Sequence, residues 1–155
     1  MDSFEKLLAL AFRYLALRPH SEKEVTDYLK KKKFPQEVED NVLAYLKEHR
    51  LVDDEEFARW FVDQRTRVKP KGIHVIRLEL KQKGIAEEVI ERVFKTPDSD
   101  TKPQVEIAQK LVESRLSRYS HLSKQEIYQK LGAFLARRGF DWETIRRALD
   151  ATLSK

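Results

Sequence analysis

The chain has 155 residues, of which 41% are hydrophobic and 37% charged, and its formal net charge is +5. The hydrophobic fraction is sufficient for a core, which excludes wholesale disorder, and the charged fraction lies well above the roughly 25% of average globular proteins. Only four glycines and five prolines argue against an all-β protein, the absence of cysteine excludes disulfides and thiolate metal sites, and the positive charge favours a polyanionic partner.

The N-terminal stretch, residues 1–20, is apolar but is interrupted by Glu5, Lys6 and Arg13. It has no small-residue cleavage site, so the sequence does not predict a signal peptide. No stretch approaches the ~18 uncharged apolar residues of a membrane span. These features predict a soluble, cytoplasmic protein.

Three helices are predicted in the first 50 residues, with the sequences LAFRYLALR (10–18), SEKEVTDYL (21–29) and PQEVEDNVLAYL (35–46). The apolar residues of the first helix recur at i, i+1, i+4 and i+5 and define one stripe. Ser21 and Glu24 form an S-x-x-E capping box at the start of the second helix. Pro35 stands where a first-turn proline is harmless, and Glu37 complements the positive end of the third helix.

The same three patterns follow in residues 51–95, as FARWFVDQR (57–65), GIHVIRLEL (72–80) and AEEVIERVF (86–94). The acidic run at residues 53–56 opens the first of these helices and complements its dipole. Its buried stripe is predicted to be Phe57, Ala58, Phe61 and Val62. Gly72 replaces the capping serine of the second helix.

A polar segment at residues 96–103 is predicted to be a linker, and the pattern then returns as IAQKLVESR (107–115), SKQEIYQKL (123–131) and DWETIRRALDATL (141–153). The second helices begin at residues 21, 72 and 123, a constant interval of 51 residues, and end at KKF (32–34), KGI (83–85) and RGF (138–140). The last of these stops comes four residues late, which is about one extra helical turn. Chance similarity among helices is the alternative explanation.

The recurrence predicts an all-α protein of three tandem three-helix repeats, stacked into an elongated, curved body. The expected boundaries are residues 1–50, 51–95 and 104–155, with the linker at 96–103.

Basic residues are dense between residues 65 and 84, where Glu79 is the only acid, whereas acids dominate residues 37–63. We name the basic segment at residues 65–81 the basic tail. A surface with separate basic and acidic regions could dock on a partner of mixed charge, and the basic region could bind the phosphates along a nucleic acid. The alternative is that these charges lie on helix faces that are only exposed to solvent. The candidate partner-binding residues are Arg65, Arg67, Lys69, Lys71, Arg77, Lys81, Arg137 and Arg138.

No catalytic constellation is evident in the sequence. The four histidines, His20, His49, His74 and His121, have no metal-ligand spacing and are expected at helix caps or on the surface. No phosphate-binding loop is present. An enzyme, a metal and a cofactor are therefore not expected.

The segment VDDEEFARWFVDQR (52–65) resembles the D-D-x-x-F-A-x-x-F-V-x-x-R signature of the RecX family, regulators of the RecA recombinase. GIHVIRLELKQKGI (72–85), YLALRPHSEKEVTDYLKKKKF (14–34) and RGFDWETI (138–145) also resemble family patterns, so the likeness spans most of the chain. Two residues depart from it: Lys33 replaces a common glycine, and Val52 replaces a common leucine.

The resemblance implies a non-enzymatic modulator, in the first place an inhibitor, that binds the RecA filament on single-stranded DNA and limits its growth. ATP hydrolysis, strand exchange and coprotease activity would fall, which links the protein to recombination, DNA repair and the SOS response. A monomer is expected, with DNA contacted directly or through the filament. The alternative is a sequence-independent or helix-turn-helix-like DNA-binding protein, which the acidic starts of the third helices disfavour.

Overall fold

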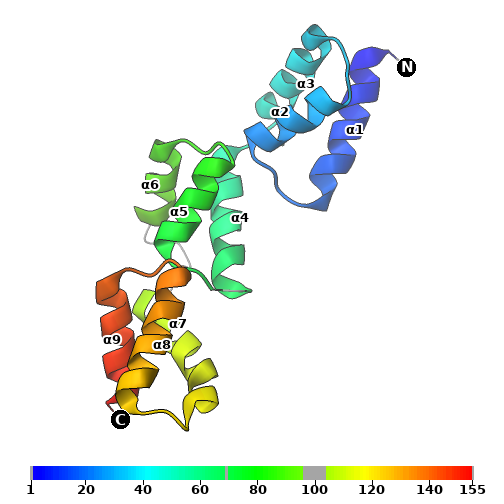
Figure 1. The fold of residues 1–155 in the computed structure, drawn as a ribbon. Coiled ribbons are helices and arrows are strands. Elements are labelled where there is room, and N and C mark those ends of the chain that lie inside the picture. The colour runs from blue at the N-terminus through cyan, green and yellow to red at the C-terminus, as the bar shows by residue number, and fades with distance from the viewer. Residues whose placement is uncertain (1, 69, 96–103, 155) are drawn as a thin grey trace. The chain divides into compact units, whose positions relative to one another are not determined.

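A computed structural model of the chain describes residues 2–68, 70–95 and 104–154. Within these ranges the protein consists of nine α-helices and one short 3-10 helix, without strands (Figure 1). The predicted all-α class is therefore confirmed. No helix in the described ranges is both long and apolar enough to cross a membrane.

The helices follow the predicted order of three per repeat. Their bounds are α1 (Ser3–Leu17), α2 (Glu22–Lys31), α3 (Gln36–Glu48), α4 (Asp54–Arg67), α5 (Ile73–Gln82), α6 (Glu87–Lys95), α7 (Gln104–Leu116), η1 (Ser117–Tyr119), α8 (Lys124–Arg137) and α9 (Trp142–Leu153). The predicted linker at residues 96–103 lies outside the described residues.

Polar side chains begin several helices as the sequence predicts. Ser21 and Glu24 form the complete capping box of α2, in which each side chain bonds the backbone amide of the other residue. Ser123 accepts from the Glu126 amide at 3.2 Å at the start of α8. These bonds satisfy amide groups that a helix leaves without an internal partner.

All three second helices end in the same backbone geometry. Lys33, Gly84 and Gly139 have positive φ angles of 59°, 82° and 93°. The amide of each residue donates to the carbonyl three positions earlier, at 3.2, 3.0 and 3.0 Å. This left-handed cap favours glycine, so the lysine at position 33 is the exception.

The chain divides into two compact units, which we call the N-terminal unit (Met1–Phe61 and Leu80–Pro97) and the C-terminal unit (Val62–Glu79 and Asp98–Lys155). The middle repeat is shared between them, because the division falls within α4 and within α5. The three predicted domain boundaries are neither confirmed nor excluded by this division.

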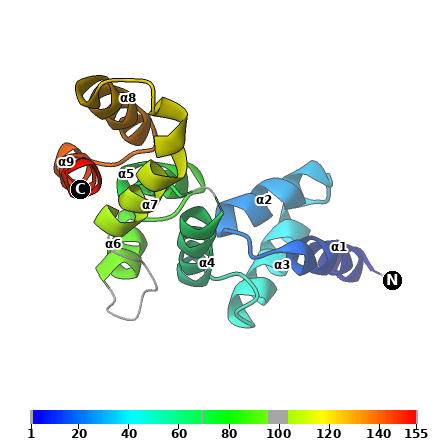
Figure 2. The same ribbon diagram turned by 90° about the horizontal axis from the view of Figure 1, so that it is seen from below.

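The hydrophobic cores come from the predicted apolar stripes. Leu7, Ala11, Val25, Leu29, Val42, Leu46 and Val52 form a buried cluster where α1, α2 and α3 meet. Ile107, Ala108, Val112, Leu131, Phe134, Leu135, Phe140, Ile145, Ala148 and Leu149 form the corresponding cluster of α7, α8 and α9, helices that also group together in Figure 2. The predicted stripe of α4, Phe57, Ala58, Phe61 and Val62, is buried as well. Each fully buried aliphatic side chain contributes roughly 1.5–3 kcal/mol.

The structure decides between the two places predicted for His20, a helix cap or the surface. His20 is only 5% exposed, stacks on Tyr14 with ring centroids 3.8 Å apart, and its Nε2 lies 3.0 Å from the Tyr14 carbonyl oxygen. Burial lowers the pKa of His20, which favours the neutral ring. His20 therefore lies at the C-terminal cap of α1, where its ring binds a carbonyl of the last turn, and it is buried rather than on the surface.

Candidate partner-binding surface

The basic tail spans the end of α4, the connection that follows it and α5. Arg65 and Arg67 lie in the last turn of α4, and Arg77 and Lys81 are one helical turn apart on α5. The connection contains two further candidates, Lys69 and Lys71, of which Lys69 lies outside the described residues.

Two of the candidate cations converge on one carboxylate within the C-terminal unit. Arg65 Nε donates to Glu79 Oε2 at 2.9 Å, and Lys71 Nζ donates to Glu79 Oε1 at 3.3 Å. The pairs join α4, the connection and α5. Arg65 therefore has a structural role, because its ion pair with Glu79 links α4 to α5.

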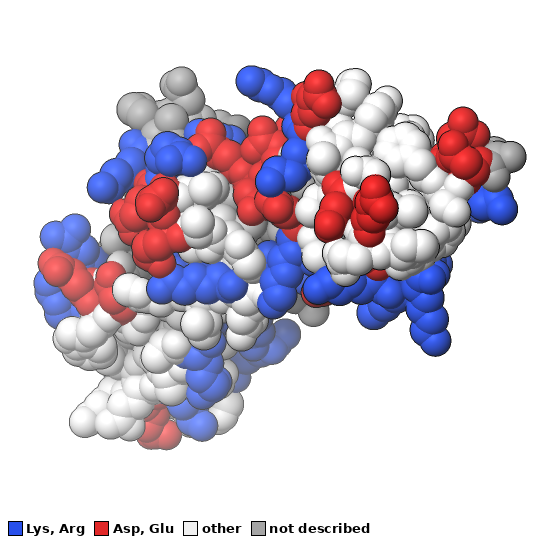
Figure 3. Space-filling view, turned by 90° about the horizontal axis from the view of Figure 1, so that it is seen from above, with Lys and Arg blue, Asp and Glu red and all other residues white. Residues whose placement is uncertain are grey.

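Other cations of the tail also have acidic neighbours. Arg67 pairs with Asp63 at 2.8 Å within α4, and Lys81 pairs with Glu87 of α6 at 3.0 Å. Figure 3 shows acidic side chains directly beside basic ones on the face that it displays. Because exposed ion pairs contribute only about 0–1 kcal/mol, a partner's carboxylates or phosphates could replace these acids at little cost.

The two candidates at the end of α8 differ in their surroundings. Arg138 Nη1 donates to the Pro70 carbonyl at 3.2 Å, and its guanidinium lies 5.1 Å from the Phe134 ring centroid. Arg138 therefore holds the connection of the basic tail within the C-terminal unit. Arg137 is exposed, and no carboxylate of the described residues is within ion-pair distance of it.

Exposed apolar side chains lie within the basic tail, and the charge pattern alone did not reveal them. Val68 is 72% exposed and Leu78 is 59% exposed. In the sequence, both are apolar residues outside the predicted apolar stripes, and this position could have indicated their exposure. Single exposed apolar side chains are common on protein surfaces, and at a protein interface they can add apolar contact beside the charged residues.

A further ionic cluster, centred on the largely buried Glu24, lies outside the predicted candidates, in the N-terminal unit. Glu24 of α2 accepts from Arg18 at 2.7 and 3.2 Å, from Lys83 at 3.1 Å and from the Ser21 amide at 3.0 Å. Burial raises the pKa of Glu24, but the hydrogen bonds from Arg18, Ser21 and Lys83 outweigh it and lower the pKa to about 2. This cluster joins the first repeat to the second.

The segments 10–18, 57–65 and 107–115 all end in an arginine, and these three arginines are fixed by contacts, although the partners differ. Arg18 and Arg65 pair with carboxylates, whereas the Arg115 guanidinium lies 4.1 Å from the Phe134 ring centroid. A cation over an aromatic face is a comparable attraction. The position therefore serves the fold of each repeat.

These observations define a class of protein: a tandem array of three-helix repeats with charged surfaces. In the described ranges it has no cluster of three or more histidine or acidic side chains that could hold a metal. Residues 8–46, 53–93 and 102–149 match the family models described as the first, second and third three-helix domains of RecX. The chain belongs to the RecX family.

Similar proteins cover nearly the whole chain. The protein named "Regulatory protein RecX" of Chlorobium phaeobacteroides is 37% identical over 148 residues, which cover 94% of this chain and 93% of that protein. The protein of the same name in Prosthecochloris aestuarii is 36% identical, over 96% and 95% of the two chains. The crystal structure of RecX from Lactobacillus salivarius is 26% identical and covers 96% of each chain, with a TM-score of 0.82.

Proposed function

We propose that this protein is a non-enzymatic modulator of the RecA recombinase, which inhibits RecA by binding its filament on single-stranded DNA and limiting filament growth. The observation that supports this most directly is the match of all three repeats, in order, to the three RecX domains. The similar curated proteins carry the name regulatory protein. That name is in line with a role in binding rather than in turnover.

The basic tail is the surface that we assign to the filament. Arg67 and Lys81 are exposed cations with weak acidic partners, and Val68 and Leu78 are exposed apolar side chains between them in the sequence. Opposite charge on a partner would speed encounter, and the apolar side chains would be buried on docking. The assignment extends to Lys69, Lys71, Arg77, Arg137 and Arg138, with Arg65 and Arg138 also acting in the fold.

DNA reading by the third helices is the less favoured alternative. Glu37, Glu88 and Glu143 lie in the first turns of α3, α6 and α9. A recognition helix places its N-terminal residues against DNA, where these carboxylates would meet phosphates of the same charge. Direct DNA contact is therefore expected to be weak and independent of sequence.

Co-sedimentation with RecA assembled on single-stranded DNA tests the proposal. The protein is expected to sediment with the filament at salt concentrations that release it from bare DNA, because the apolar contacts resist screening while phosphate contacts do not. Equal retention by bare DNA and by the filament across the salt range would favour the DNA-binding alternative. Absence of the protein from both pellets would contradict both functions.

A further inference from the structure

Within the N-terminal unit, the start of α2 packs against the end of α5. Lys23 Nζ donates to the Gln82 carbonyl at 3.2 Å, and Lys83 Nζ donates to Glu24 at 3.1 Å. A Cβ added at Gly84 would lie 2.7 Å from the Cβ of Lys23, closer than two such carbons can approach. The two helices meet this closely only because the cap of α5 is a glycine.

Within the C-terminal unit, the start of α5 packs against the end of α8 in the same way. The Gly72 amide donates to the Arg138 carbonyl at 2.6 Å. A Cβ added at Gly139 would overlap the side chain of Val75, which is the counterpart of Glu24. The same junction, a helix start on a glycine-capped helix end, therefore occurs twice in one chain.

The following repeat also supplies a side-chain acceptor at both junctions. The Glu22 amide donates to Asp54 Oδ1 at 2.8 Å, and the Ile73 amide donates to Gln104 Oε1 at 3.1 Å. Asp54 and Gln104 are the first residues of α4 and α7. Each occupied helix start thus receives a glycine-capped helix end and an acceptor from the first helix of the same neighbour.

The start of α8 has the same position in the third repeat but is not occupied in this way. Residues 123–126 are all exposed, whereas Ser21 and Gly72, the counterparts of Ser123, are buried. The amide of Lys124, the counterpart of Glu22 and Ile73, donates to no acceptor among the described residues. Among the described residues, the first amide of α8 therefore has no acceptor, whereas the corresponding amides of α2 and α5 are hydrogen-bonded.

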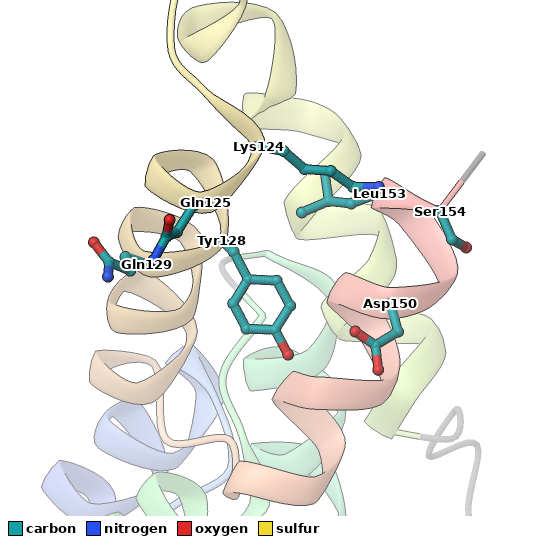
Figure 4. Close-up of a pocket in the computed structure, with 7 residues that line it drawn as sticks. All are labelled: Lys124, Gln125, Tyr128, Gln129, Asp150, Leu153 and Ser154. Carbon is teal, nitrogen blue, oxygen red and sulfur yellow. The ribbon is translucent and has the colours of Figure 1, made fainter.

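An open groove of about 640 Å³ lies beside this helix start, between α8 and the end of α9. Lys124, Gln125 and Tyr128 line it from α8, and Leu153 lines it from α9. Figure 4 shows Tyr128 pointing from α8 towards α9. The groove offers an apolar floor next to the free amide.

We propose that residues 123–126 and this groove form a docking surface, the α8 docking surface, for a three-helix repeat of another polypeptide. The two junctions within the chain define the chemistry of the occupant. Its second helix ends in a lysine or arginine, a left-handed glycine and a large hydrophobic residue, as at Lys83–Ile85 and Arg138–Phe140. Its first helix begins with a side-chain acceptor for the Lys124 amide, and its basic residue pairs with Glu126 as Lys83 pairs with Glu24.

A second copy of this chain does not fit the surface, and the reason is Lys33. The end of α2, Lys32–Phe34, has the left-handed cap of the other repeats and is exposed at Lys32 and Lys33. Lys33 carries the Cβ that would collide at both observed junctions. This residue therefore prevents head-to-tail association of identical chains, and the occupant must supply a glycine. The proposal does not depend on RecA being the partner.

The variant Lys33→Gly turns the end of α2 into the required occupant and makes the surface measurable with the full chain alone. It folds, because glycine relieves the left-handed conformation of residue 33. In a concentration series of ¹⁵N NMR spectra, the amide signals of residues 123–126 and 32–34 are expected to shift together in this variant. The wild-type chain and the variant Lys33→Ala, which keeps a Cβ, are expected to show no such shift.

Adding Glu126→Lys to Lys33→Gly places a cation opposite Lys32 and is expected to weaken the association by about tenfold or more. Three results would each overturn the proposal. One is the absence of concentration-dependent shifts in Lys33→Gly up to about 1 mM, where millimolar association is detectable. The others are shifts that map away from residues 123–126, and equal association of the wild-type chain.

Discussion

The substitution Glu24→Gln removes the charge at the centre of the ionic cluster in the N-terminal unit while keeping the size of the side chain and one acceptor oxygen. Arg18 and Lys83 would lose their carboxylate partner, and the side chain of Glu24 is only 13% exposed. We therefore expect that replacing one carboxylate oxygen by an amide nitrogen measurably lowers the free energy of unfolding.

The magnitude follows from the pKa of Glu24, which is about 2 in the folded protein. An unfolded glutamate has a pKa of roughly 4.3, and each unit of difference corresponds to about 1.4 kcal/mol, so the ceiling is about 3 kcal/mol. The Arg18 and Lys83 side chains are 35% and 38% exposed. Solvent screening reduces the expected loss to about 1–2 kcal/mol.

The pH dependence gives a second signature. A folded pKa that is depressed contributes stability that is present above the unfolded pKa and is lost as the pH falls through the folded value. The difference between wild type and Glu24→Gln should be complete at pH 7 and should vanish as the pH falls from roughly 4.3 towards 2.

Urea unfolding followed by tryptophan fluorescence at pH 7 and at about pH 2.5 measures both quantities. The matched control is Glu126→Gln, the same position in the third repeat, because Glu126 is exposed and pairs with no cation among the described residues. The control should change stability by less than about 0.5 kcal/mol. Equal losses for the two variants, or a loss for Glu24→Gln that is unchanged at low pH, would refute the reasoning.

Three further predictions concern the junctions, the basic tail and DNA. Gly84→Ala and Gly139→Ala should each destabilise the protein by about 1–3 kcal/mol, because both combine a positive φ with a collision. Gly132→Ala within α8, where a Cβ meets only ordinary contacts, should be neutral or stabilising by up to about 1 kcal/mol in thermal unfolding. In the tail variant, Arg67, Lys69, Lys71 and Lys81 are replaced by Glu, and its helical circular dichroism should stay intact. Its co-sedimentation with the RecA filament should become weaker and less dependent on salt. The same change at residues 30–33 should matter less. A folded tail variant that inhibits RecA as well as the parent would show that the tail is only a solvated surface. Binding to DNA alone should be weak, independent of sequence and strongly salt-dependent in fluorescence anisotropy; a sharp preference for one duplex sequence at high salt would contradict this.

The repeats and most helix ends could be predicted because their signals are local, but the start of α1 at Ser3, seven residues before the predicted segment 10–18, was missed. Ser21 with Glu24 at one end of α2, and the glycines at 84 and 139, are determined by backbone geometry within a few residues. The apolar stripe of α4 follows from the helical period alone. The elongated, curved body depends instead on the arrangement of the repeats and stays a prediction.

The ionic environment of the basic tail could not be predicted, because it depends on how helices pack. Glu79 lies fourteen residues from Arg65 and eight from Lys71, yet it binds both of them. The burial of His20 likewise depends on the packing of its ring against Tyr14. A charge count along the chain cannot distinguish a cation held by an internal carboxylate from one that is available to a partner.

The rate of ATP hydrolysis by RecA on single-stranded DNA tests the central claim most directly. If this protein stops filament growth, one bound molecule affects many RecA subunits, so amounts well below one per RecA should reduce the rate. The tail variant with four glutamates should require a higher ratio for the same reduction. An unchanged rate at every ratio, with the protein folded and RecA active, would contradict the proposed function.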